Sequence, residues 1–310
     1  MADSPSDTAF QLSSGTSFAA PAITGSINLL NQLRTSLHTN SRAWLASSMK
    51  GLVIHTTDEA DGTGPDYKFG WGLMNTLRAA DLIRNNATNG WKSFIKEVFL
   101  PNGGSIDFPV LALDGTNALK VTACWTDPAG PAHTNASVDP VTPRLVNDLD
   151  LRIISPSGAT NFPWVLNPDL TNQTSAARSA LATTGDDSRN NVEQVAITNA
   201  VASNYVVRVT HKGSLNTNGQ WVSLLISGVQ AQTKPALVIS QPSITASNKL
   251  AFAWPSVVGQ LYQVQYLNNF EGASWSNWDG EISATKTNTA LEVDMNGPDG
   301  RRFYRVKEVE

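Results

Sequence analysis

The sequence predicts a multidomain chain that is helical at its start and all-β over the rest. Apolar residues recur at helical spacing up to about residue 90, whereas short alternating strands, separated by Pro, Gly and Asn turns, fill the remainder. A length of 310 residues is enough for two or three domains with sizeable cores. We expect the domains to cover residues 1–92, 93–231 and 235–310.

Three helices are expected in the first unit, over 17–37, about 41–55 and about 73–85. The first of them follows a turn at Gly15, and it tolerates Pro21 because a proline in the first turn removes no helical hydrogen bond. A Gly- and Asp-rich loop, "TTDEADGTGPDYKFGWG", separates the second helix from the third.

The middle unit is expected to form a jelly-roll-like barrel, because its strands are short and regularly spaced. Its clearest strands read "NALKVTACW", "DLDLRIIS", "VEQVAI", "NYVVRVTH" and "WVSLLISGV". After the linker "AQTKPALVISQPS", the last unit contains the strands "KLAFAWPS", "LYQVQYL", "ALEVDMN" and "RRFYRVKEV". These predict a small β-sandwich, similar to the fibronectin-type or immunoglobulin-like appendages of secreted bacterial proteins.

The composition argues against a nucleic-acid-binding or membrane-spanning protein. The net charge is −4, only 15% of the residues are charged, and Lys and Arg form no cluster that would bind phosphates. No apolar run approaches the ~20 residues that cross a bilayer. The opening "MADSPSDTAFQL" has neither the basic nor the apolar region of a signal peptide. We therefore expect no nucleic acid partner and no membrane span.

Cys124 is the only cysteine, so an intrachain disulfide is impossible. In "LKVTACWTDP" it alternates with apolar neighbours, which is typical of a buried, unreactive thiol rather than a reactive one. If the protein is secreted, its stability must therefore come from hydrophobic cores, with or without a bound metal, rather than from disulfides.

Ser17 is the first candidate for chemistry. It lies in or next to the first turn of the first predicted helix, where free backbone N–H groups and the helix dipole can hold an anion. The alternative is a serine that only caps the helix. The small residues Gly15, Ala19 and Ala20 let other groups approach closely, which suits a nucleophile that a substrate must reach.

The stretch "GTSFAAP", residues 15–21, resembles the serine motif of the subtilisin-like serine peptidases, the subtilases of peptidase family S8. Further on, "YKFGWGLMNTLRAADLI" resembles the segment that leads their catalytic domains into the last helix. The stretches "ACWTDPAG", "RLVNDLDLRIISPSG" and "RNNVEQVAI" resemble the β-barrel that follows the catalytic domain in one branch of the family. The resemblance covers roughly residues 10 to 230, with three motifs in the family's order.

The resemblance implies a helical C-terminal remnant of an α/β subtilase domain, then a jelly-roll-like barrel, then a sandwich. It also implies the C-terminal part of a bacterial serine endopeptidase, secreted or at the cell surface, that cleaves polypeptides and is monomeric. In that family Ser17 would be the acylating nucleophile, and its own backbone N–H would donate to the oxyanion.

One departure from the family concerns the other catalytic residues. A subtilisin triad runs Asp, His and then Ser along the chain, but only 16 residues precede Ser17 here. The histidines all follow Ser17, and none has the family's His-Gly-Thr context; they are His38, His55, His133 and His211. His55 ends a helical segment and is interpreted as a C-terminal-turn or partly buried histidine rather than a catalytic one. We expect these 310 residues alone to be inactive.

A second candidate site is a group of carboxylates in the middle unit. Asp148 and Asp150 project from one strand face, where two anions repel unless a cation lies between them. Oxygen ligands of this kind suit Ca²⁺, and calcium sites are usual in the subtilases that the chain resembles. The expected companions are Asp127, Asp187, Asn191 and Glu193. The alternative is that Asp148 accepts turn N–H bonds and that Asp150 pairs with Arg152 or Arg189.

A different class of function stays open, a non-catalytic extracellular module that binds a surface, a glycan or a protein. Trp275 and Trp278 in "ASWSNWDG" could stack on a sugar ring or pack on the sandwich, and we favour packing. The gene sequence upstream of Met1 distinguishes the two classes, because a peptidase requires the Asp and His motifs there.

Overall fold

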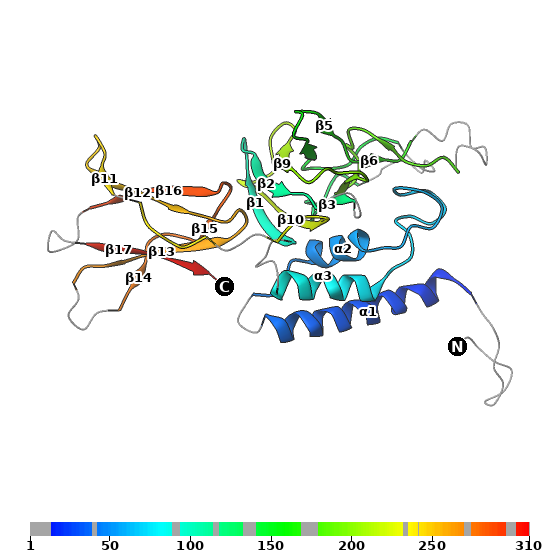
Figure 1. Cartoon of the computed structure of the whole chain (residues 1–310), viewed down its shortest axis with the longest axis horizontal. Coiled ribbons are helices and arrows are strands. Elements are labelled where there is room, and N and C mark those ends of the chain that lie inside the picture. The colour runs from blue at the N-terminus through cyan, green and yellow to red at the C-terminus, as the bar shows by residue number, and fades with distance from the viewer. Residues whose placement is uncertain are drawn as a thin grey trace.

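The computed structural model describes most of the chain, in ten stretches. These are residues 14–38, 42–88, 94–113, 118–132, 141–168, 179–231, 235–240, 242–269, 274–295 and 302–309. Figure 1 shows three parts in chain order, which are a layer of helices, a central β unit and a third β unit at the far end. The chain is mostly sheet, as the sequence predicts.

Three helices form the first part: α1 (Thr16–Leu37), α2 (Ala46–His55) and α3 (Thr76–Thr88). The first begins and ends almost where predicted. The second helix begins later than expected, at Ala46, because a residue of the central unit, Glu97, caps its N-terminus. The Glu97 carboxylate accepts a hydrogen bond from the backbone N–H of Leu45 at 2.6 Å, just before the first turn of α2.

Eight strands of the central unit form two antiparallel four-stranded sheets, with orders β1-β10-β3-β8 and β2-β9-β4-β5. The strands are β1 (Ile95–Pro101), β2 (Ile106–Leu111), β3 (Leu119–Trp125), β4 (Leu149–Ile154), β5 (Thr160–Asn161), β8 (Val192–Ile197), β9 (Asn204–His211) and β10 (Gly219–Ser227). Two further short strands, β6 (Trp164–Val165) and β7 (Thr183–Thr184), pair only with each other.

Among the described residues the two sheets do not close into the predicted barrel, because no ladder joins the edges of one sheet to the edges of the other. They form an open sandwich instead. Alternate side chains of both sheets, such as Val121, Leu151 and Val207, fill the core between them and are at most 1% exposed.

The helices pack on the outer face of the first sheet. Leu52 and Ile83 share a buried cluster with Ile95 of β1 and Leu225 of β10. A side chain at Gly51 would come within 2.5 Å of the end of the Leu225 side chain, so a larger residue in α2 would require Leu225 to move. The apolar faces of the helices therefore meet this antiparallel sheet.

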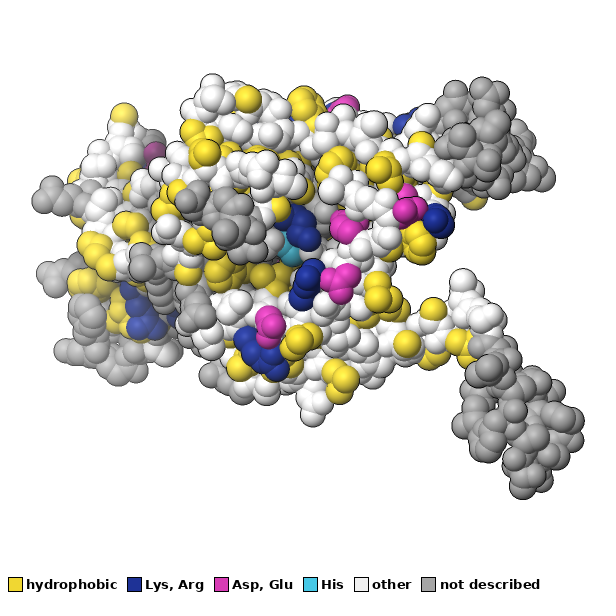
Figure 2. Space-filling model, turned by 45° about the vertical axis from the view of Figure 1, so that its right-hand side comes forward, with side chains coloured by type: hydrophobic (Ala, Val, Ile, Leu, Met, Phe, Trp, Pro, Cys, Tyr) yellow, Lys and Arg dark blue, Asp and Glu magenta, His cyan; other side chains and the backbone are white. Residues whose placement is uncertain are grey.

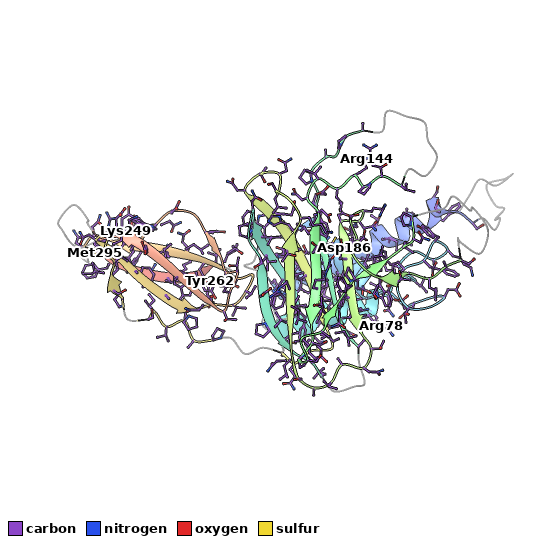
Figure 3. The ribbon with its side chains drawn as sticks, turned by 90° about the horizontal axis from the view of Figure 1, so that it is seen from above. Arg78, Arg144, Asp186, Lys249, Tyr262 and Met295 are labelled. Carbon is purple, nitrogen blue, oxygen red and sulfur yellow. The ribbon has the colours of Figure 1, made fainter. Side chains whose placement is uncertain are left out.

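The third part pairs two antiparallel sheets, and Figure 3 shows it beside the central unit, with Tyr262 between its strands. One sheet contains β11 (Ser243–Ile244), β12 (Lys249–Pro255) and β16 (Asn288–Asp294), and the other contains β13 (Leu261–Leu267), β14 (Ser276–Asn277), β15 (Ile282–Ser283) and β17 (Phe303–Val309). Trp278 packs against the core of this unit, as favoured from the sequence, and Trp275 lies under the Arg305 guanidinium.

The turn between β12 and β13 joins the third part to the central unit. Val258 in this turn is 3% exposed and belongs to the core cluster of the central unit. The Lys96 ammonium donates to the Val258 carbonyl at 3.4 Å. Gly259 has a φ of +85°, and a side chain there would meet Val98 at 2.6 Å. The turn thus fits into the sandwich without room for a larger residue.

Candidate active site

Ser17 is the second residue of α1, and Gly15 occupies the N-cap position. The backbone N–H of Phe18 donates to the Gly15 carbonyl at 3.0 Å, which closes the first turn. The Ser17 side chain is exposed and makes no capping hydrogen bond. The observed serine is therefore not the N-cap that the alternative interpretation required, and its hydroxyl faces solvent at the positive end of a helix.

The first half of α1 extends away from the rest of the molecule. Every residue from 16 to 25 is exposed, and the buried residues of the helix come only later, at Leu30 and Arg34. Phe18 is 43% exposed and Ile23 is 36% exposed. Figure 2 shows yellow side chains along this projecting arm. An exposed apolar helix end is typical of a surface that another part of a protein covers.

The described histidines do not reach Ser17. His38 follows the last residue of α1, and a rise of 1.5 Å per residue places it about 30 Å from Ser17. His211 lies in β9 of the sandwich, where its Nε2 accepts a hydrogen bond from the Gly103 N–H at 2.8 Å. His133 lies outside the described residues.

His55 is the last residue of α2 and is 2% exposed, which confirms its interpretation as a buried C-terminal-turn histidine. Its Nδ1 lies 2.8 Å from the Thr122 hydroxyl and its Nε2 lies 3.0 Å from the Ser227 hydroxyl. Burial lowers the pKa of His55 well below its usual value, and the charge of Lys120 lowers it further. Both ring nitrogens are thus occupied within the structure.

Two cavities lie on either side of the turn between β12 and β13, with volumes of about 310 and about 440 Å³. His38, Trp44 and Lys96 are among the residues that line the smaller one. Ser17 lines neither of these two cavities.

The predicted carboxylate site contains an ion-pair network. Arg152 lies 2.8 Å from Asp150 and 3.6 Å from Glu193. Lys212 lies 3.1 Å from Asp150, 3.4 Å from Asp148 and 2.8 Å from Asp186. Arg152 also pairs with Asp186. The pairing of Asp150 with Arg152 is the one that the alternative to calcium predicted.

Glu193 is the deepest carboxylate of this network and is 0% exposed. Its Oε2 accepts the backbone N–H of Leu151, which β5 leaves unpaired at the edge of β4, while its Oε1 has no hydrogen-bond partner among the described residues. Burial raises the pKa of Glu193 to about 9, against the opposing effects of the Leu151 N–H and the Arg152 charge. The side chain is therefore a neutral acid at neutral pH.

The other predicted ligands bind elsewhere. Asp127 accepts the backbone N–H groups of Val146 and Asn147, both at 2.8 Å. Asp187 accepts the backbone N–H of Arg189 at 2.9 Å. Asn191 donates to the Trp125 carbonyl and accepts from Lys50. Within the described residues, no group of three or more His, Cys, Asp or Glu side chains is arranged to hold a metal ion.

Sequence reasoning missed Lys212, which is the central cation of the network. Burial disfavours its charged form, but the hydrogen bonds that the Lys212 ammonium donates to the Asp186 and Asp150 carboxylates raise its pKa above the usual value. Lys212 follows β9 directly, and β9 pairs with β4 so that Asp150 lies opposite Thr210. Only this register of β9 against β4 brings the Lys212 ammonium within reach of Asp148 and Asp150.

Cys124 is buried, as predicted. It lies in β3 on the face that meets α2, and its side chain is within 3.2 Å of the position that a side chain at Gly51 would take. Burial raises the pKa of the thiol to about 11. A protonated, inaccessible thiol is unreactive, so Cys124 takes no part in a site.

Residues 2–72 match Peptidase_S8, the subtilase family. This stretch contains the "GTSFAAP" motif with Ser17, α1, α2 and the loop up to Gly72. The match is consistent with a C-terminal part of a subtilisin-like peptidase. A search of curated proteins found no match.

A solved structure with weak similarity is the Spr0440 glycoside hydrolase domain, Endo-D, from Streptococcus pneumoniae R6. It is 11% identical, the alignment covers 69% of this chain and 32% of that one, and the TM-score is 0.15. The chain therefore spans about a third of the length of that solved structure, and the likeness carries no inference about fold or function. No helix in the described part of the chain is long and apolar enough to cross a membrane.

Proposed function

We propose that the chain is the C-terminal portion of a secreted subtilisin-like serine endopeptidase, in which Ser17 is the nucleophile that attacks the peptide carbonyl. The single observation that carries this proposal is the subtilase match over residues 2–72, which contains the serine motif. The place of Ser17 supports it, because an exposed hydroxyl in the first turn of a helix lies where backbone N–H groups can stabilise an oxyanion.

The exposed first half of α1, residues 16–25, also supports the proposal. Its exposed Phe18 and Ile23 offer an apolar surface to the part of a catalytic domain that would supply the Asp, the His and the oxyanion Asn. The polypeptide substrate, a bacterial secreted or cell-surface location and a monomeric state follow from the same family resemblance. The division into 1–92, 93–231 and 235–310 follows from it as well. The six- to nine-residue strands of the middle unit, taken in chain order, alternate between the two sheets, which supports a jelly-roll-like middle unit.

The gene tests this proposal. The coding sequence directly upstream of Met1 is expected to continue in frame and to contain an Asp-Thr/Ser-Gly segment followed by a His-Gly-Thr-His segment. An upstream stop codon without these motifs would favour the alternative, a non-catalytic extracellular module. No observation on the described residues favours that alternative specifically, since Trp278 packs in the core of the third unit.

Calcium binding at Asp148 and Asp150 is a second proposal. It rests on the density of carboxylates, and a calcium ion there has to displace the Lys212 ammonium from both aspartates. A ligand at 100 times its dissociation constant adds about 2.7 kcal/mol to the stability of the native state. The melting temperature is therefore expected to rise with millimolar calcium and to fall with a chelator.

Two variants distinguish calcium from the ion pairs. Asp148→Ala is expected to abolish the calcium response, and Lys212→Met is expected to enlarge it, because the competing cation is gone. A melting temperature that is indifferent to calcium in the unmodified chain, together with destabilisation by Lys212→Met, would assign the site to the ion pairs alone.

A further inference from the structure

One sheet of the third unit carries a row of hydrogen-bonded polar side chains. Gln265 of β13 stands opposite Arg305 of β17 on one side and opposite Asn277 of β14 on the other. The Arg305 Nε and Nη2 donate to the Gln265 Oε1 at 2.9 and 2.7 Å. The Gln265 Nε2 in turn donates to the Asn277 Oδ1 at 2.8 Å. One hydrogen-bonded row therefore crosses three neighbouring strands.

This row lies on the outer face of the sheet, away from the core of the third unit. Val264, next to Gln265, and Val306, next to Arg305, both belong to that core. Because successive side chains of a strand point to opposite faces, Gln265 and Arg305 point outward. Arg305 and Asn277 are exposed, and Gln265 between them is half-buried. A ligand in solution can therefore reach the row.

An aromatic ring holds the Arg305 guanidinium in place. The guanidinium carbon lies 4.3 Å from the centre of the Trp275 ring. Trp275 is half-buried, and in the described structure the core cluster of the third unit is contacted by Trp278 but not by Trp275. The ring and the two bonds to Gln265 fix the guanidinium from two directions. Arg305 therefore loses little conformational freedom when it binds a ligand.

The charge on this face favours an anionic ligand. The bonds to Gln265 use the Nε donor and one Nη2 donor of Arg305, which leaves its Nη1 donors for a ligand. Lys307 is exposed two residues further along β17, on the same face. Neither cation forms an ion pair with a carboxylate in the part of the chain that the structure describes. Gln265 and Asn277 are neutral, so the positive charge of this face is not compensated by the row itself.

We propose that this outer face binds an acidic polysaccharide built of uronate sugars. Arg305 pairs with the carboxylate of one sugar, and Lys307 meets the carboxylate of a neighbouring sugar. Trp275 packs against the apolar face of a sugar ring, and the Asn277 amide bonds to hydroxyl groups.

The mixture of groups favours a polysaccharide over an acidic peptide. A chain of carboxylates without rings and hydroxyls would use the two cations, Arg305 and Lys307, but neither the Trp275 ring nor the Asn277 amide. The site belongs to the third unit and does not depend on Ser17. It suits a peptidase and a non-catalytic module equally, so its presence or absence does not decide between them.

The experiment is affinity electrophoresis of the complete chain in native gels that contain increasing amounts of polygalacturonate. Two polymers serve as matched comparisons. Methyl-esterified polygalacturonate has the same rings without the charges, and polyglutamate has the charges without the rings. The net charge of the chain is −4, which opposes binding to any polyanion, so retardation requires a local site. We expect polygalacturonate to retard the chain at a lower concentration than either comparison polymer.

Variants locate the binding on this face. Arg305→Gln is expected to weaken binding about tenfold or more, because a hydrogen-bonded charge pair is lost. Trp275→Ala is expected to weaken it about fivefold through the lost ring contact. Arg305→Lys keeps the charge but loses the planar fork, so its affinity should lie between those of wild type and Arg305→Gln. Lys249→Gln is the matched control that should bind as wild type does, because Lys249, labelled in Figure 3, belongs to β12 of the other sheet.

Three results would overturn the proposal. The first is a chain that polygalacturonate does not retard. The second is equal retardation by polyglutamate, which would assign the face to acidic peptides, or by the methyl ester, which would exclude a role for the charges. The third is binding that Arg305→Gln and Trp275→Ala leave unchanged, which would place the polysaccharide elsewhere on the molecule.

Discussion

Ser17 is expected to stay unlabelled by a fluorophosphonate when the 310 residues are assayed alone, and casein is expected to stay intact. A serine hydroxyl is a weak nucleophile at neutral pH and needs a base within hydrogen-bond reach. His38 lies about 30 Å away along α1, and both nitrogens of His55 are bonded to other side chains. In subtilisin itself, loss of the serine or histidine of the triad lowers kcat on the order of a millionfold.

The same serine is expected to react once the missing partners are present. In a chain extended upstream to a full catalytic domain, we expect fluorophosphonate labelling at Ser17 and hydrolysis of casein. Ser17→Ala should remove both signals, and Ser14→Ala is the matched control that should keep them, because Ser14 precedes the turn that starts α1.

Labelling of Ser17 in the 310 residues alone would contradict this argument, because it requires a base that the described residues do not place beside the serine. An extended chain that hydrolyses casein equally well with Ser17→Ala would contradict the assignment of the nucleophile. The first result concerns activity of this chain, and the second concerns the proposed function.

Strands were predicted well where one face is buried. The stretch "NYVVRVTH" coincides with β9, where buried residues alternate with less buried ones, which is the period of two of a half-buried strand. The stretch "LYQVQYL" coincides with β13, although successive residues of β13 are buried and do not alternate. The two-residue strands, such as β5 and β14, were not predicted. Two residues contain no period, and their pairing depends on the strand that the fold brings beside them.

The start of α2 shows a second limit of sequence reasoning. Helical spacing predicted a start near residue 41, but the helix begins at Ala46. No Ser, Thr, Asp or Asn stands at its N-cap, which is Leu45, so the local signal is absent. Glu97, a residue of β1, bonds the Leu45 N–H and the Ser48 hydroxyl instead. A cap from a distant strand is visible only in the folded chain.

The carboxylate group shows how far the candidate site could be predicted. The alternation of "NDLDLRI" correctly separated Asp150 from the core residues Leu149 and Leu151. It could not indicate which cation stands between the aspartates, because Lys212 comes from the next strand in the sheet. The choice between Ca²⁺ and an ammonium thus depends on register, which the sequence alone does not specify.

Glu193→Gln is expected to stabilise the central unit at neutral and alkaline pH. The buried Glu193 carboxyl has a pKa of about 9, against an ordinary value of 4.5. Between these values the unfolded chain ionises and the folded chain does not, so the unfolded state binds fewer protons and the free energy of unfolding falls as pH rises. Near pH 7 this cost is on the order of 3 kcal/mol, and a glutamine does not incur it.

The geometry suits this substitution. A glutamine has the shape of the neutral acid, and its amide oxygen can accept the Leu151 N–H that Glu193 accepts now. Within the described part of the chain the Glu193 Oε1 has no hydrogen-bond partner, so replacing it breaks no hydrogen bond there. The Asp186→Asn variant is expected to lower the free energy of unfolding instead. Asp186 is half exposed, and Lys212 and Arg152 lower the pKa of its carboxyl against the effect of burial. Loss of that charge removes a favourable pairing.

The measurement is the unfolding of wild type and both variants in denaturant, from about pH 4.5 to about pH 9. The advantage of Glu193→Gln over wild type should be small at the acid end, where Glu193 keeps its proton in the folded chain and is only about half ionised in the unfolded chain, and should grow with pH. The Asp186→Asn variant should be less stable than wild type at neutral pH. A Glu193→Gln chain that is less stable than wild type at neutral pH, with a constant difference across the range, would show instead that Glu193 is ionised in the folded protein and paired with Arg152.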